Sequence, residues 1–428
     1  MKRFKTLVLS VYLVFIFNSA AQAATLGPAE NYAQLLELAA SADTGDVILL
    51  TGEIIADEHT PLSTSAAITL KSGGSELATL RGLRLESAQI AARDVRFEDS
   101  LLIRGTSHVE LGSGVTVTGA SGQTGLSFDG NGSLILYPEC SVTGGDGSEG
   151  MTITHRGGEF YAGIEGTISG GSGLTGGSGL TISGLTDAGA LMIAGTISGG
   201  NGSTHGGQAL NLYDLRGNAF ITVTGQLTGG DGSVGGDGIQ VVATDDNASV
   251  GIHGQVTGGK GLSYGGDALI LMNMSGASSV SLSGSLTGGD VTESGAKPGT
   301  SLLVVGSGSA SRTHMGDCSL QDGIDLAALN ATPTPAPTEV PDVTPLPEIT
   351  SSVEDSQQLA TPAPTPSPEA TAEPTPEPTE APTVEPTATP TPEPTPVASE
   401  IPSPTPEVSA EPSPEETVSP VPETTPAI

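Results

Sequence analysis

Apolar residues recur in pairs two positions apart along residues 120–305, and polar or glycine-rich segments separate the pairs. A spacing of two places both side chains of a pair on one face of a β-strand. One series comprises Leu126/Phe128, Met151/Ile153, Leu180/Ile182, Leu210/Leu212, Ile239/Val241, Leu269/Leu271 and Leu302/Val304. A second series comprises Leu191/Ile193, Ile221/Val223, Val250/Ile252 and Val280/Leu282. Single aliphatic residues then follow at Val142, Ile168, Ile197, Leu227, Val256 and Leu286. The pattern predicts about three short strands per repeat, with apolar side chains facing inward.

A Thr/Ser-Gly-Gly step marks each repeat. The steps begin at Thr143, Ser169, Ser198, Thr228, Thr257 and Thr287, after an imperfect copy at Thr118, and lie 25 to 30 residues apart. Such a period is typical of stacked units that bury a core only against their neighbours. A flexible Gly/Ser linker would not keep the aliphatic positions in phase. Glycine fits at these turns because a Cβ would clash there or because φ is positive. The sequence therefore predicts a parallel β-helix.

The segment before the repeats strengthens this prediction. Residues 31–43 form an amphipathic helical pattern, and strand-like segments follow at 45–50, 67–70, 78–80, 83–85 and 95–97. With these features, residues 30–325 resemble the right-handed parallel β-helix superfamily, the pectin-lyase-like fold. The resemblance implies an all-β solenoid whose N-terminal helix caps the open end of the core. It implies no particular activity, because one fold hosts many functions.

The ends of the chain differ from the repeats in composition. Residues 1–23 are expected to be a signal peptide, with a basic start, an apolar stretch over 7–17 and a small-x-small site at Ala21-Gln22-Ala23. We assign residues 24–110 to the cap and first rungs and residues 111–325 to the repeats. No second apolar run is long enough to span a membrane, so a secreted protein is expected.

Residues 326–428 are expected to form a disordered Pro/Thr/Glu-rich stalk. Residues 331–428 contain 27 of the 31 prolines, 17 acidic residues and no basic residue. Such a segment cannot bury enough apolar surface to fold, and proline with like charges extends it. The tail resembles the Pro-Thr stalks of Gram-positive surface proteins, although it lacks a Leu-Pro-x-Thr-Gly motif. We therefore expect the protein to be associated with a cell surface.

The net charge limits the possible ligands, and the spacing of the two cysteines excludes a disulfide between them. The formal net charge is −34, and no basic patch is available for nucleic acid or anionic lipid. The two cysteines, Cys140 and Cys318, lie six or more rungs apart. At about 4.8 Å per rung, this distance exceeds the reach of a disulfide, so two unpaired thiols are expected.

The sequence lacks the residues that an enzyme of this fold would need. Asp245-Asp246 is the only pair of adjacent acids in the repeats, and it lies in a turn-like segment. His253 faces outward by alternation, but Thr224 and Ser283 occupy its position on the adjacent rungs. General acid–base catalysis needs positioned pairs of acids. We therefore expect no enzyme and no catalytic residue; the alternative is a polysaccharide lyase or hydrolase that acts on pectic or other acidic glycans.

Two aspartates suggest a calcium site. Asp237 and Asp267 follow Gly-Gly pairs and occupy the same position on successive rungs. Carboxylates about 4.8 Å apart repel each other unless a cation or water screens them. Ca²⁺ with carboxylate and backbone oxygen ligands would fit, whereas solvated turn aspartates are the other interpretation. Both interpretations stay open, and no other cofactor is expected.

Two outward-facing features suggest a binding surface. Tyr137, Tyr161, Tyr213 and Tyr264 are the aromatic residues that could stack on a sugar, although they share no column. Paired hydroxyl residues such as Thr116/Thr118 and Thr167/Ser169 form a Thr-x-Thr array that resembles the ice-binding faces of solenoid antifreeze proteins. The glycine-punctuated turns also resemble clostridial carbohydrate-binding β-helices. The favoured function is therefore non-catalytic adhesion to a polysaccharide through one lateral face, with a purely structural protein as a further alternative.

Overall fold

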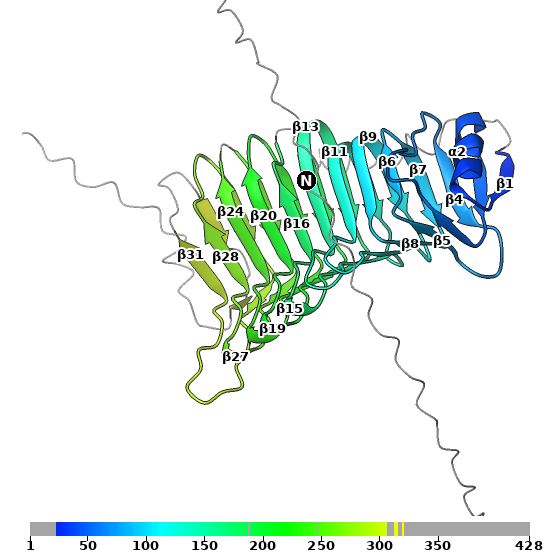
Figure 1. The fold of residues 1–428 in the computed structure, drawn as a ribbon. Coiled ribbons are helices and arrows are strands. Elements are labelled where there is room, and N and C mark those ends of the chain that lie inside the picture. Colours follow the sequence, from blue (N-terminus) through cyan, green and yellow to red (C-terminus); the bar gives the residue numbers. More distant parts are fainter. Residues whose placement is uncertain (1–22, 187–188, 246, 306–311, 316–318, 321–428) are drawn as a thin grey trace, which may run out of the picture. The chain divides into compact units, whose positions relative to one another are not determined.

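The computed structural model describes residues 23–186, 189–245, 247–305, 312–315 and 319–320. These residues form an all-β parallel solenoid, as predicted, in which each turn of the chain stacks on the preceding one (Figure 1). The expected signal peptide up to residue 22, Cys318 and the expected stalk lie outside the described residues. No helix in the described part of the chain is long and apolar enough to cross a membrane.

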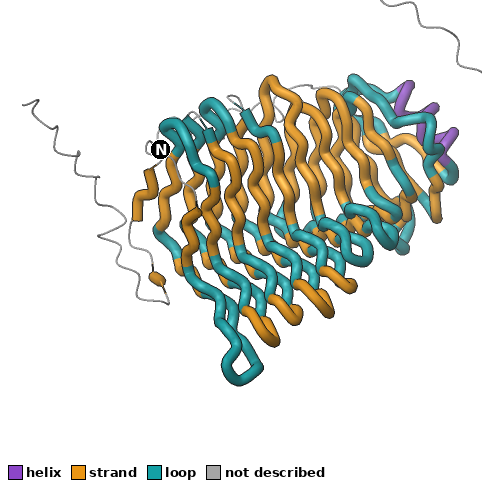
Figure 2. Tube along the Cα trace, turned by 60° about the vertical axis from the view of Figure 1, so that its left-hand side comes forward, coloured by secondary structure: helices purple, strands orange, loops and turns teal. Residues whose placement is uncertain are grey.

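A single helix covers the first turns of the solenoid (Figure 2, purple). Helix α2 (Tyr32–Ser41) begins after Asn31, whose side-chain oxygen accepts a hydrogen bond from the Gln34 backbone amide at 3.1 Å. This N-cap satisfies one of the free amides of the first turn. Leu35 on the helix is fully buried in the core. The helix predicted over residues 31–43 is thus confirmed, and it shields the first strands from solvent.

The largest sheet has 18 strands and forms two of the lateral faces of the solenoid. In three successive turns one long strand continues around a corner, over Leu101–Leu111, Leu126–Leu136 and Met151–Ile164, whereas in later turns the same path is split into two strands. At this split, Gly184, Asp214, Ala243 and Asn273 have φ between 52° and 70°. The strands are β1 (Thr25–Ala29), β2 (Val47–Leu50), β4 (Ile68–Ser72), β6 (Arg84–Glu86), β7 (Gln89–Arg93), β9 (Leu101–Leu111), β11 (Leu126–Leu136), β13 (Met151–Ile164), β16 (Leu180–Ser183), β17 (Gly189–Ile193), β20 (Leu210–Leu215), β21 (Phe220–Val223), β24 (Ile239–Thr244), β25 (Ser249–Ile252), β28 (Leu269–Met272), β29 (Ser279–Leu282), β31 (Leu302–Val305) and β32 (Arg312–Met315).

The second sheet has 11 short parallel strands, one from each turn. They are β3 (Glu53–Ile55), β5 (Ala78–Arg81), β8 (Val95–Glu98), β10 (Thr116–Thr118), β12 (Ser141–Thr143), β14 (Thr167–Ser169), β18 (Thr196–Ser198), β22 (Gln226–Thr228), β26 (Gln255–Thr257), β30 (Ser285–Thr287) and β33 (Ser319–Leu320). A third sheet of four strands, β15 (Gly173–Thr175), β19 (Gly202–His205), β23 (Gly232–Val234) and β27 (Gly261–Tyr264), was not predicted. It projects beside the main stack in Figure 1.

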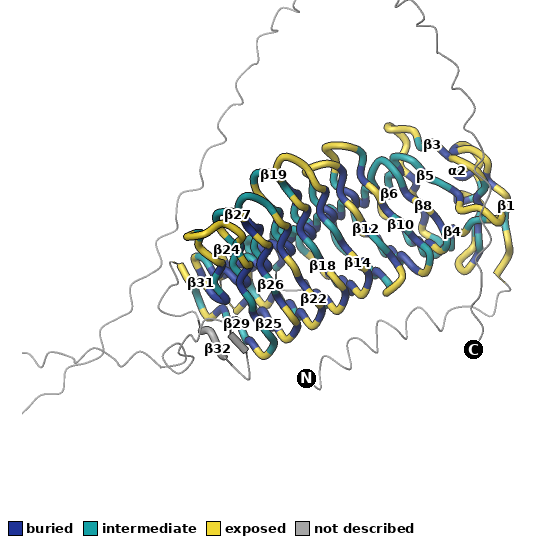
Figure 3. Tube along the Cα trace, turned by 90° about the horizontal axis from the view of Figure 1, so that it is seen from below, coloured by how far each residue is buried: buried dark blue, intermediate teal, exposed yellow. Residues whose placement is uncertain are grey.

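The predicted aliphatic columns form the core. Their side chains pack together from turn to turn. The corresponding positions are coloured as buried along the stacked turns in Figure 3. Leu212, Val241 and Leu271 occupy one column and are fully buried. Val304 continues this column but is 37% exposed, because no described strand follows β31 in its column. Burial of such columns supplies the hydrophobic stabilisation that the single repeats lack.

The glycine pairs form a narrow neck from which the third sheet projects. A single file of backbone hydrogen bonds crosses this neck, in which Gly207 donates to Gly200, Gly230 to Gly207 and Gly236 to Gly230, each at 2.8 Å. A Cβ on Gly230 would lie 2.0 Å from the Gly200 carbonyl oxygen. The φ of Gly230 is not in the left-handed region. Close backbone approach, rather than positive φ, therefore requires glycine at this position.

Candidate functional site: the hydroxyl face

The outward surface of seven consecutive strands in the second sheet carries only small hydroxyl residues and two glutamines. Strands β10, β12, β14, β18, β22, β26 and β30 are paired in parallel and in register, so their first and third residues form two straight columns. We call this surface the hydroxyl face. It consists of Thr116, Thr118, Ser141, Thr143, Thr167, Ser169, Thr196, Ser198, Gln226, Thr228, Gln255, Thr257, Ser285 and Thr287.

The hydroxyl face is rigid because its other side is core. Each of the seven strands has a buried aliphatic residue between its two outward residues, for example Ile168 and Ile197, which are fully buried. Ser169 and Ser198, on adjacent strands, are in direct contact, with Ser198 Oγ donating a hydrogen bond to Ser169 Oγ at 3.0 Å. Neighbouring strands of a sheet lie about 4.8 Å apart. The face therefore presents hydrogen-bonding groups at regular intervals in both directions.

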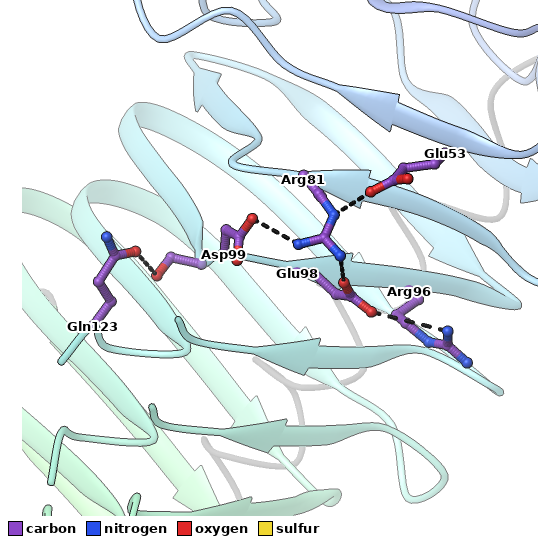
Figure 4. A network of polar contacts seen from close by, with 7 residues as sticks. Glu53, Arg81, Arg96, Glu98, Asp99 and Gln123 are labelled. Atoms are coloured by element: carbon purple, nitrogen blue, oxygen red, sulfur yellow. Dashed lines mark hydrogen bonds and ion pairs between the residues drawn. The ribbon is translucent and has the colours of Figure 1, made fainter. Parts of the chain in front are cut away.

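Charged residues of the same sheet lie at its N-terminal end. Arg81 on β5 contacts three carboxylates, with Nη2 at 2.6 Å from Glu98, Nη1 at 2.9 Å from Asp99, and Nε against Glu53 (Figure 4). These contacts raise the pKa of Arg81, mainly through the hydrogen bond to Asp99. Arg96 lies further away, 3.9 Å from Glu98. Exposed ion pairs contribute little to stability, and this cluster ends where the hydroxyl face begins.

The structure does not bring the four candidate tyrosines together. Tyr213 and Tyr264 belong to different sheets, and Tyr137 and Tyr161 lie on other columns. Tyr137 donates a hydrogen bond to Glu110 at 3.3 Å, and Tyr213 donates to Gln240 at 3.2 Å. Tyr264 alone among the four is largely exposed, at 55%. An aromatic platform made of several tyrosines is therefore not formed.

The two candidate calcium aspartates are stacked as predicted. Asp237 Oδ1 accepts a hydrogen bond from the Asp267 backbone amide at 2.9 Å, and Asp267 Oδ1 accepts from the Thr300 amide at 2.6 Å. Burial, together with the neighbouring Asp267 charge, raises the pKa of Asp237 to about 6. Among the described residues no group of three or more His, Cys, Asp or Glu side chains could hold a metal ion. Calcium would therefore need backbone oxygens as additional ligands.

The remaining candidate groups are separated from one another. Cys140 is a free, buried cysteine, and burial raises the pKa of its thiol to about 12. Asp245 accepts a hydrogen bond from Ser275 at 3.0 Å, whereas Asp246 lies outside the described residues. His253 is exposed, as the alternation predicted, and its Nδ1 lies 2.5 Å from Ser283 Oγ. Cys140 is a core residue, and the raised pKa of its thiol disfavours the thiolate that a nucleophile needs.

Comparisons with known proteins identify no relative of this chain. No protein-family model, no curated protein and no solved structure matches the chain.

One feature beside the face could not be located from the sequence. Where β22 and β26 begin, a shallow open hollow of about 430 Å³ is lined by Thr224, Gln226, His253, Gln255, Ser285 and three glycines. In the sequence, Gln226 and Gln255 appear only as interruptions of the Thr/Ser columns. The replacement of Thr196 by Gln226 and Gln255 in the following turns is the sequence signal for this hollow. The signal does not show which residues of other columns lie beside the two glutamines.

Proposed function

We propose that this protein is an exported, non-catalytic binding module that adheres to a neutral polysaccharide through the hydroxyl face. The observation that carries the proposal is the absence of charge from this face in a chain whose formal net charge is −34. Two outward residues on each of seven strands are Thr, Ser or Gln. Hydroxyl and amide groups both donate and accept hydrogen bonds, as the hydroxyl groups of a neutral sugar do.

The surrounding charge supports a neutral rather than an acidic ligand. An acidic polysaccharide would approach a negatively charged protein against its field. Rigid strands also reduce the entropy lost on binding, because the hydroxyl groups are held in place before contact. The expected signal peptide and acidic stalk support export and display at a cell surface.

Charge placed on the face tests this proposal. Full-length protein carrying Thr167→Glu and Thr196→Glu should lose at least about tenfold of its affinity for insoluble cellulose, chitin or mannan, because two buried carboxylates at the contact would be unpaired. Sedimentation binding assays measure the loss. The matched control is Thr152→Glu/Thr181→Glu, which places two carboxylates at paired outward positions of β13 and β16 in the largest sheet and should leave binding unchanged.

Two outcomes would contradict the proposal. Equal polysaccharide binding by the double variant and the wild type would exclude the hydroxyl face. Release of unsaturated or reducing-end products from polygalacturonate in an overnight digest would favour the lyase or hydrolase alternative.

A further inference from the structure

A strip of glycine backbone, which we call the trough, lies at the bend between the large sheet and the second sheet. In four successive later turns the chain passes this bend through a glycine, namely Gly195, Gly225, Gly254 and Gly284. A Cβ on Gly225 or Gly254 would lie 2.0 Å from the carbonyl oxygen of the glycine one turn earlier. Stacking alone therefore explains these glycines. Their absent side chains leave a floor of bare backbone between two rows of outward side chains.

The outward side chains on the two sides of the trough differ in length from turn to turn. One wall is formed by the residues before the glycines, Ala194, Thr224, His253 and Ser283, and the other by the residues after them, Thr196, Gln226, Gln255 and Ser285. The longest side chains fall on two adjacent turns, those of β22 and β26. This is where the shallow, open hollow of about 430 Å³ lies.

The imidazole of His253 is held in place at this wall. Its Nδ1 lies 2.5 Å from Ser283 Oγ, one turn further along. Its Nε2 lies 2.8 Å from the position that a Cβ of Gly251 would occupy, so the missing side chain of Gly251 provides the room for the ring. The backbone amide of His253 donates to the Val223 carbonyl at 2.7 Å. The contact with Ser283 therefore orients this exposed ring beside the hollow.

We infer that this hollow is a sugar-binding subsite at the border of the hydroxyl face, which receives one neutral pyranose of the bound polysaccharide. The inference rests on the proposed function and adds the position at which one sugar unit is selected. Gln226 and Gln255 supply planar amides that donate to one hydroxyl group and accept from the next. The fixed imidazole supplies a flat surface for the sugar ring. The lining residues include no Lys, Arg, Asp or Glu, which favours a neutral ligand.

The neighbouring turns supply the variant that tests the subsite. The levelled variant combines Gln226→Thr, Gln255→Thr and His253→Thr. Each substitution introduces the residue that a neighbouring turn already has in the same column, at Thr196 or Thr224. The substitutions lie outside the core, so we expect an unchanged melting temperature. The probes are cellohexaose, mannohexaose, xylohexaose and chitohexaose, measured by isothermal titration calorimetry with the full chain. The wild type should bind at least one of them, and the levelled variant should bind that probe at least about tenfold more weakly.

The results separate this inference from the proposed function. Equal affinity of the levelled variant and the wild type for the bound probe would overturn the subsite and leave adhesion through the face intact. If Thr167→Glu/Thr196→Glu loses binding and the levelled variant does not, the subsite is likewise overturned and adhesion through the hydroxyl face is supported. If the wild type binds none of the four oligosaccharides, the subsite is also overturned, whereas binding to insoluble polysaccharide tests the proposed function independently.

Discussion

At the scale of single residues, Asp237 makes the folded protein sensitive to pH. Burial raises the pKa of its carboxyl group from 3.8 to about 6, although the hydrogen bond from the Asp267 amide acts in the opposite direction. The folded state therefore favours the protonated carboxyl group. Its contribution to stability is complete below pH 3.8 and is lost as the pH rises through 6. The total loss is about 3 kcal/mol at most.

Replacement of Asp237 by Asn removes the buried charge and keeps an oxygen that can accept from Asp267. We expect Asp237→Asn to raise the stability at pH 7.5 by about 1–3 kcal/mol and to have little effect at pH 4, as measured by thermal unfolding followed by circular dichroism. Asp231→Asn is the matched control, because Asp231 accepts a backbone hydrogen bond from Lys260 at 2.8 Å but is exposed. This control should change stability by no more than about 0.5 kcal/mol.

The same pair of variants distinguishes the two interpretations of the aspartate column. If the turn aspartates bind Ca²⁺, added calcium should raise the melting temperature of the wild type and of Asp231→Asn but not of Asp237→Asn. If they bind no Ca²⁺, calcium should have the same effect on all three proteins. A lower stability of Asp237→Asn at pH 7.5 without calcium would show that the charge of Asp237 stabilises the fold.

At the scale of the element, each turn depends on the glycine neck. We expect Gly230→Ala to destabilise the protein by about 3 kcal/mol, because its Cβ would lie 2.0 Å from a backbone oxygen that cannot move without displacing the next turn. Gly74→Ala is the control, since its Cβ would have 3.9 Å of room, and it should be neutral. Chemical denaturation of both variants measures the difference. Equal stability of the two variants would refute the requirement for close approach.

The sequence predicted the elements well where neighbouring turns repeat the same pattern. The aliphatic columns, the capping helix and the alignment of Asp237 with Asp267 all depend on period and alternation, and the structure contains them. The third sheet was missed because segments such as Ser172-Gly173-Leu174-Thr175 are too short and too rich in glycine to show alternation. The hollow was missed because its lining comes from residues about 30 positions apart that the stacking of turns brings together, and the bend then separates the lining into two rows.

At the scale of the whole molecule, the distribution of charge determines which polysaccharides can approach. The chain has a formal net charge of −34, and the hydroxyl face has no ionisable residue among its outward positions. Binding of a neutral polysaccharide should therefore depend on hydrogen bonds and shape. Binding of an acidic polysaccharide should be opposed by a repulsion that salt screens, because the Debye length falls from about 30 Å at 0.01 M to about 10 Å at 0.1 M salt.

This difference gives a prediction for the full-length protein. Affinity for the neutral polysaccharide that it binds should change by less than about twofold between 0.01 and 0.5 M NaCl, because no ion pair forms at the contact. Polygalacturonate should not bind at 0.01 M NaCl. Affinity electrophoresis in gels that contain either polysaccharide measures both quantities at matched ionic strength. Binding of polygalacturonate that weakens as salt is added would mean that cationic side chains hold an acidic glycan, and the exposed Arg81 and Arg96 beside the hydroxyl face would then be the first residues to replace.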